Sequence, residues 1–120
     1  MKFAFMIMGQ FDPDTDRALM HGGTVQMIGV SNMDEACRTA RELCDQGVDC
    51  IELCGAFEEE GARRVIEATG NKVPVGYVVH LPSQDPLFQA LFGKCPGGTI
   101  DGSGTYTGGS HGRYPWRAPS

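Results

Sequence analysis

Apolar residues in the first part of the chain form short continuous runs that alternate with segments of helical periodicity. Each run is bounded by glycine, proline or an acid, as expected for the strands of a parallel sheet. Four such runs are predicted to be strands: Lys2–Met8, Thr24–Val30, Val48–Cys54 and Val73–Leu81. The second contains polar residues, which favours a position at the edge of the sheet.

Helical segments are predicted after each strand. Asp12 can cap a short helix from Pro13 to about His21, because proline suits the first helical position. The acids of this segment also resemble the start of a calcium loop. The glycine and glutamate that such a loop requires are missing, so calcium is excluded.

The second helix is bounded by a cap at Ser31 or Asn32 and by Gly47. Its apolar positions recur at helical spacing, and they direct Cys37 and Cys44 toward the core, where cysteine acts as a small apolar residue. Two further helices complete the pattern: Phe57–Thr69 and Asp85–Gly93.

Four strand–helix repeats indicate an α/β fold with a four-stranded, mostly parallel open sheet and helices on both faces. We expect a flavodoxin-like strand order, or half of a (βα)8 barrel that a partner would close. The strands Phe3–Met8 and Val48–Cys54 should be adjacent, parallel and central, since continuous apolar runs suit strands covered on both faces.

The composition changes after Lys94. Residues 1–94 are expected to form one α/β domain, and residues 95–120 are rich in glycine, serine and proline. This segment is predicted to be an irregular tail, disordered or docked on a partner subunit through Tyr106 or Trp116. An Asp-Gly turn at Asp101 could also form a hairpin within it.

Charge and cysteine content limit the partners and the compartment. The net charge is −5, which argues against a nucleic-acid partner, and no apolar run approaches the length of a membrane span. The number of cysteines is 5, which argues against a fully paired disulfide framework and favours a reducing cytoplasm.

The carboxyl ends of the strands form a rim, where open α/β sheets bind ligands. Five residues are predicted to bind a small molecule there: Gln10, Ser31, Gly55, Ala56 and Phe57. The turn at Gly55 leads into helix amides that could bind an anion, but the acids that follow it disfavour phosphate.

Three residues near this rim are candidates for catalysis: Glu52, Cys54 and His80. Glu52 interrupts an apolar strand, so we expect a buried carboxyl with a raised pKa that acts as a general base or an orienting group. The alternative is a structural acid that hydrogen-bonds to Tyr77 or a backbone amide, or reaches past the sheet edge. Cys54 and His80 would end adjacent strands and could form a nucleophile pair. A mixed zinc site is the alternative, but no ligand spacing supports it, so no metal is assigned and the cofactor is unknown.

The chain resembles a family of small, uncharacterised prokaryotic proteins classed as a domain of unknown function. The resemblance is carried by Ile51–Phe57, Val65–Ala68 and Lys72–Gly76, together with the initial MKFAF and the IGVS turn. It covers about residues 1–94. It implies an α/β fold and brings no activity or catalytic residue.

Two functions are compatible with these features. The first is binding or catalysis on a small molecule at the rim, around Glu52, Cys54 and His80. The second is a non-enzymatic, oligomer-forming or interaction protein that uses its sheet edge and aromatic tail. In both cases we expect a homo-oligomer.

Overall fold

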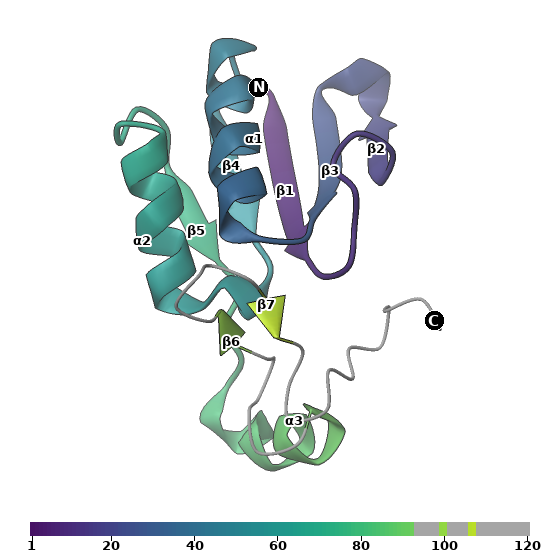
Figure 1. Cartoon of the computed structure of the whole chain (residues 1–120), viewed down its shortest axis with the longest axis vertical. Coiled ribbons are helices and arrows are strands. Elements are labelled where there is room, and N and C mark those ends of the chain that lie inside the picture. Colours follow the sequence, from purple (N-terminus) through teal and green to yellow (C-terminus); the bar gives the residue numbers. More distant parts are fainter. Residues whose placement is uncertain (93–98, 101–105, 108–120) are drawn as a thin grey trace.

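The computed structural model describes residues 1–92, 99–100 and 106–107. Its main part has two layers, a five-stranded sheet and a pair of helices (Figure 1). The strands are β1 (Phe3–Met8), β2 (Arg17–Met20), β3 (Val25–Val30), β4 (Cys50–Leu53) and β5 (Val75–Tyr77). The helices are α1 (Met33–Asp45), α2 (Glu58–Ala68) and α3 (Asp85–Phe92), with short 3-10 turns η1 (His21–Gly23), η2 (Gly55–Phe57) and η3 (Pro82–Gln84).

The strand order is β2-β3-β1-β4-β5. β3, β1, β4 and β5 are parallel, and β2 pairs antiparallel with β3. The prediction that β1 and β4 are adjacent, parallel and central is confirmed, with Phe3 paired to Cys50. The α/β class with a mostly parallel sheet is also confirmed, but there is one more strand than predicted, and β3 lies inside the sheet instead of at its edge.

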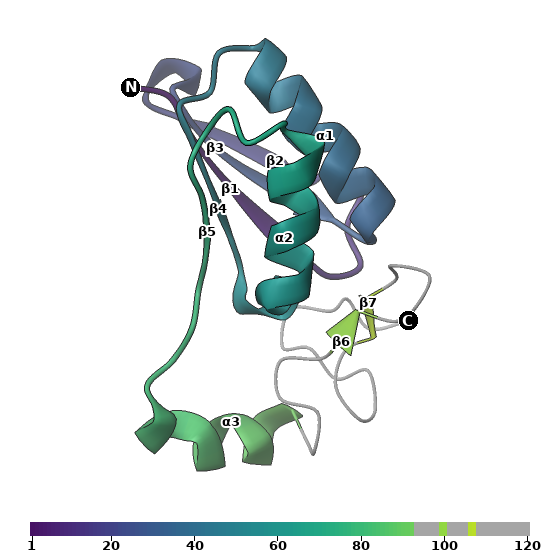
Figure 2. The ribbon, with the colours of Figure 1, turned by 90° about the vertical axis from the view of Figure 1, so that its left-hand side faces the viewer.

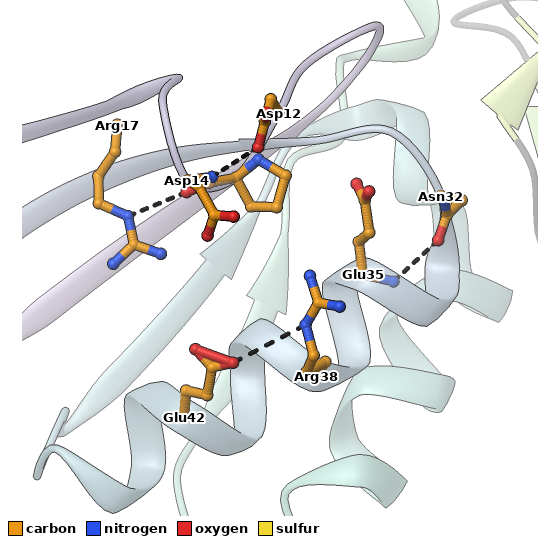
Figure 3. Close-up of polar contacts among 8 residues, drawn as sticks. Asp12, Asp14, Arg17, Asn32, Glu35, Arg38 and Glu42 are labelled. Carbon is orange, nitrogen blue, oxygen red and sulfur yellow. Dashed lines mark hydrogen bonds and ion pairs between the residues drawn. The ribbon is translucent and has the colours of Figure 1, made fainter.

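The predicted helix from Pro13 to His21 is wrong. Asp12 caps a turn instead of a helix, because its backbone oxygen accepts from the amide of Asp16 at 2.7 Å. Its side chain accepts from the amide of Asp14 at 2.9 Å (Figure 3). The chain then runs back along β3 as β2, with Arg17 opposite Ile28. Pairing with a neighbouring strand therefore outweighs the local helix-start signal.

The helix predicted between Asn32 and Gly47 is present as α1. The Asn32 side chain accepts a hydrogen bond from the amide of Glu35 at 2.8 Å, as a helix N-cap does (Figure 3). Gly47 follows the helix with a φ of 86°, a conformation that glycine adopts without strain. Both Cys37 and Cys44 are half-buried and pack against the core.

The core lies between the sheet and the helices α1 and α2. Alternate residues of the strands point into it, among them Met6, Ile28 and Ile51, which have no exposed surface. From the helices come Leu43 and Val65, which are also buried. Burial of each such side chain stabilises the fold by about 1.5–3 kcal/mol.

The predicted coverage of both sheet faces by helices is wrong. α1 and α2 lie on the same face of the sheet, and the opposite face carries no helix in the described part of the chain (Figure 2). α1 and α2 connect strands that succeed one another in the same direction across the sheet, so right-handed crossovers place both on one side. The connection from β1 to β3 runs in the other direction, but it contains β2 in place of a helix.

The fourth strand is shorter than the predicted Val73–Leu81. β5 ends at Tyr77, and the next amide, that of Val78, donates to the backbone oxygen of Leu53 at 3.0 Å. The chain then leaves the sheet and leads through η3 to α3, which lies beyond the carboxyl end of the sheet (Figure 2).

Two short strands are described in the tail, β6 (Thr99–Ile100) and β7 (Tyr106–Thr107). They pair antiparallel, with Ile100 opposite Tyr106. The other predictions for the tail, including docking through Trp116, concern residues outside the described ones. Within the described ranges, no helix has the length and apolar character needed to cross a membrane.

Candidate functional site

The uncovered side of the sheet is here called the open face. Strand alternation and register assign its residues, because paired residues of adjacent strands point to the same side. They are Phe3, Phe5 and Ile7 of β1, Ala18 and Met20 of β2, Val25, Met27 and Gly29 of β3, Cys50 and Glu52 of β4, and Gly76 of β5.

Apolar side chains dominate the open face. On its central strand, Phe3, Phe5 and Ile7 are only half-buried, whereas the alternate residues of the same strand are fully buried. Toward the β2 edge the exposure rises, to 40% for Met27 and 52% for Met20. A sheet face that is bathed in water normally alternates with polar residues, so this pattern is atypical of a solvated face.

Glu52 lies on the open face and is exposed. It pairs with Phe5 on one side and with Gly76 on the other. A Cβ placed on Gly76 would meet no heavy atom within 4 Å, so there is open space beside Glu52 at the β5 edge. The predicted buried carboxyl is therefore wrong, because it assumed a sheet covered on both faces.

Cys54 is buried at the carboxyl end of β4. Its sulfur accepts a hydrogen bond from the amide of Met8 at 3.2 Å. Burial raises the pKa of the Cys54 thiol, and the amides of Met8, Ala56 and Phe57 offset part of that rise. The structure thus favours a neutral thiol, whereas a nucleophilic cysteine needs a lowered pKa or an adjacent base.

His80 does not end a strand, as the sequence predicted, but lies between β5 and η3. Its Nε2 is 2.6 Å from Oδ1 of Asp85, and its ring stacks on Phe88 with centroids 3.9 Å apart. Among the described residues, the side-chain hydrogen bonds of Cys54 and His80 go to Met8 and Asp85 and not to one another. The proposed pair is not assembled.

The predicted ligand-binding residues differ in how accessible they are. Ser31 donates both its amide and its hydroxyl to Oε1 of Glu35 at 2.9 Å, which commits these donors to the start of α1. Ala56 and Phe57 are buried, whereas Gln10 and Gly55 are exposed. The binding roles of all five, and the catalytic roles of Glu52, Cys54 and His80, stay predictions.

A shallow groove lies between α1 and α2, on the helix layer. It is lined by Asp34, Cys37, Arg41, Arg64, Glu67 and Ala68. Arg64 lies 3.7 Å from Asp34, so its charge is already balanced there. Burial raises the pKa of the Cys37 thiol, and Arg64 and Arg41 lower it in part. The lining of this groove is mostly charged, as on an ordinary protein surface, whereas the open face exposes apolar side chains.

Together these features define a two-layer α/β protein with one apolar sheet face that no helix of the described residues covers. The chain belongs to DUF6506, a family of unknown function, whose sequence profile matches residues 1–93. This confirms the family resemblance that the sequence indicated. No curated protein and no solved structure matches the chain.

The open face is the feature that sequence analysis missed. Phe3, Phe5 and Ile7 were interpreted as one side of a strand covered on both faces. One signal was available: the connection between Gln10 and Gly23 is barely long enough for a helical crossover. Without a helix there, no helix of the described residues lies on that face of the sheet.

Proposed function

We propose that this protein is a non-enzymatic, self-associating protein, in which the open face of one copy packs on the open face of a second copy. The observation that carries the proposal is the apolar open face of a mostly parallel sheet. Parallel sheets are almost always covered on both faces, because the helices of their crossover connections pack there and the strands carry apolar residues on each side. In the described part of the chain, helices cover only one.

The dimensions of the open face suit a packed interface. The five strands have three to six residues each, and at about 3.3 Å per residue and about 4.8 Å between strands they present roughly 400 Å² of sheet surface. Apolar patches of a few hundred Å² are the largest on most small monomers and are often interaction sites. Two sheets can pack face to face about 10 Å apart with their inner side chains interdigitated.

A second copy is the occupant that the residue pattern favours. A two-fold axis parallel to β1 brings Phe5 of one copy toward Phe5 of the other, at the centre of the interface. The same axis places β4 across from β3 of the second copy, so each Glu52 faces the Met27 side and the two carboxylates are kept apart. Open space beside Gly76 lets Glu52 keep contact with water at the edge.

Sedimentation velocity on the full chain tests this proposal. Met27→Lys places a charge on the open face at a residue that is already 40% exposed, so the monomer should still fold. We expect the wild-type protein to be a dimer and Met27→Lys to weaken the dimer by at least about tenfold.

Leu19→Lys is the matched control. Leu19 lies on β2, pairs with Gln26 on the opposite side of the sheet and is 62% exposed. It introduces the same charge close by in the same sheet, but not on the open face, and should leave the dimer unchanged. A monomeric wild-type protein, or equal weakening by both variants, would contradict the proposal.

A further inference from the structure

The segment that follows β5 is here called the arm, Val78–Phe92. It extends away from the two layers, beyond the carboxyl end of the sheet (Figure 2). Several of its aliphatic side chains are among the most exposed large apolar side chains of the described residues. They are Val79 and Leu81, each 71% exposed, Leu87 at 65% and Leu91 at 58%.

The arm is internally ordered. The ring of His80 stacks on Phe88 with an interplanar angle of 7°, and Nε2 of His80 pairs with Oδ1 of Asp85. Phe88 also packs near Phe92, with ring centroids 6.1 Å apart. These contacts join the start of the arm to α3, so the exposed aliphatic residues belong to a unit that is ordered before it binds. Binding therefore costs little additional conformational entropy.

We propose that the arm of each copy packs on the second copy and completes the interface begun by the open face. This inference rests on the proposed self-association. The area supports it: the sheet surface of roughly 400 Å² is about half of the 800 Å² that a stable interface buries on each partner. The four aliphatic side chains, at about 100 Å² each, supply a comparable amount.

The topology indicates where the arm lands. The arm starts at β5, which the two-fold axis along β1 places across from β2 of the second copy. An axis along β1 preserves position along the strands, so the arms of both copies lie beyond the carboxyl end of the paired sheets (Figure 2). An arm would therefore bury its aliphatic side chains against the second copy at that end, away from Met20, which pairs with Val25 at the amino end of β3.

Paired variants of the arm test this inference in the full chain. The double variant Leu87→Lys with Leu91→Lys places charges on the exposed aliphatic side of α3. The control, Ser83→Lys with Gln89→Lys, adds the same charge at two exposed polar positions of the arm. We expect the first pair to weaken the dimer by at least about tenfold and the second to change it by less than about twofold.

Hydrogen exchange at α3 distinguishes contact with the second copy from contact with the same chain. The amides of α3 should be protected in the wild-type dimer and should lose that protection in Met27→Lys. Protection of α3 that persists in a monomeric Met27→Lys protein would mean that the arm packs on its own chain, which overturns the inference.

The failure of the arm and the failure of the self-association are separable. If Met27→Lys weakens the dimer and Leu87→Lys with Leu91→Lys does not, the open face is the interface and the arm is no part of it. If the wild-type protein is monomeric at every concentration, both proposals are wrong.

Discussion

Phe11 lies over Gly29 so closely that a Cβ on residue 29 would stand 2.5 Å from Cγ of Phe11. Gly29 is on the open face, on the last part of β3, and its amide donates to the backbone oxygen of Asp16. Phe11 belongs to the connection that contains β2 where a covering helix was expected. In place of a helix, this connection therefore covers Gly29 with the ring of Phe11.

Gly29→Ala should destabilise the fold by about 1–3 kcal/mol, because the Cβ and ring of Phe11 must move to admit a methyl group. Urea denaturation measures the loss. Gly76→Ala is the control on the same face, where an added Cβ meets nothing within 4 Å. It should be close to neutral. In a Phe11→Ala background the cost of Gly29→Ala should largely disappear, and a full cost there would contradict the contact.

Glu52→Gln should change the free energy of unfolding by no more than about 0.5 kcal/mol, because Glu52 is exposed on the open face. Ile51, the preceding residue, faces the helix layer and is fully buried. Ile51→Ala should therefore cost about 2–5 kcal/mol. Chemical denaturation of both variants tests the assignment of the two sheet faces, and a large loss for Glu52→Gln would reverse it.

Glu58→Gly should stabilise the protein by about 1 kcal/mol. Glu58 begins α2 with a φ of 56° and a ψ of −177°, a conformation that costs a residue with a Cβ but not glycine. Glu59→Gly, one position further into the helix, should instead destabilise by about 0.5–1 kcal/mol. Equal losses in the two variants would mean that residue 58 is not strained.

The pH dependence of Glu58→Gln isolates the charge of this carboxyl. Burial raises the pKa of Glu58, so the folded state favours the protonated form. Its charge therefore has no effect on stability below the ordinary glutamate value of about 4.3, lowers stability increasingly as the pH rises from there to the folded-state pKa, and has its full effect above that pKa. Glu58→Gln should be more stable than wild type at neutral pH and equal to it at acidic pH, as measured by thermal unfolding.

Cys50 provides a reporter of the open face in solution. In a variant whose other cysteines are replaced by serine, its labelling rate should fall as the protein concentration rises and the dimer forms. Burial and the adjacent Glu52 raise the pKa of the Cys50 thiol, so the comparison is made at one fixed pH. A variant that keeps only Cys37, on the helix layer, should react at a constant rate. Constant labelling of Cys50 in a demonstrated dimer would exclude this face from the interface.

The sequence by itself determined the elements whose signals are local. The apolar run of β1, the cap at Asn32 with the stripe of α1, and the strand-turn-helix from β4 to α2 all follow from side-chain periodicity and end residues. The central pairing of β1 with β4 also followed, because long apolar strands are placed inside a sheet. These features depend on residues close in the chain or on overall hydrophobicity.

Only the tertiary structure decided what covers the sheet. The segment from Asp12 to Met20 carries a valid helix-start signal, yet it forms a turn and β2, because hydrogen bonding to β3 competes with local propensity and satisfies the backbone of an otherwise open edge. With that helix absent, one face of the sheet carries no helix of the described residues, and Glu52 changes from an expected buried acid to an exposed one. Coverage of a face depends on contacts between distant segments, and no local pattern around Glu52 records it.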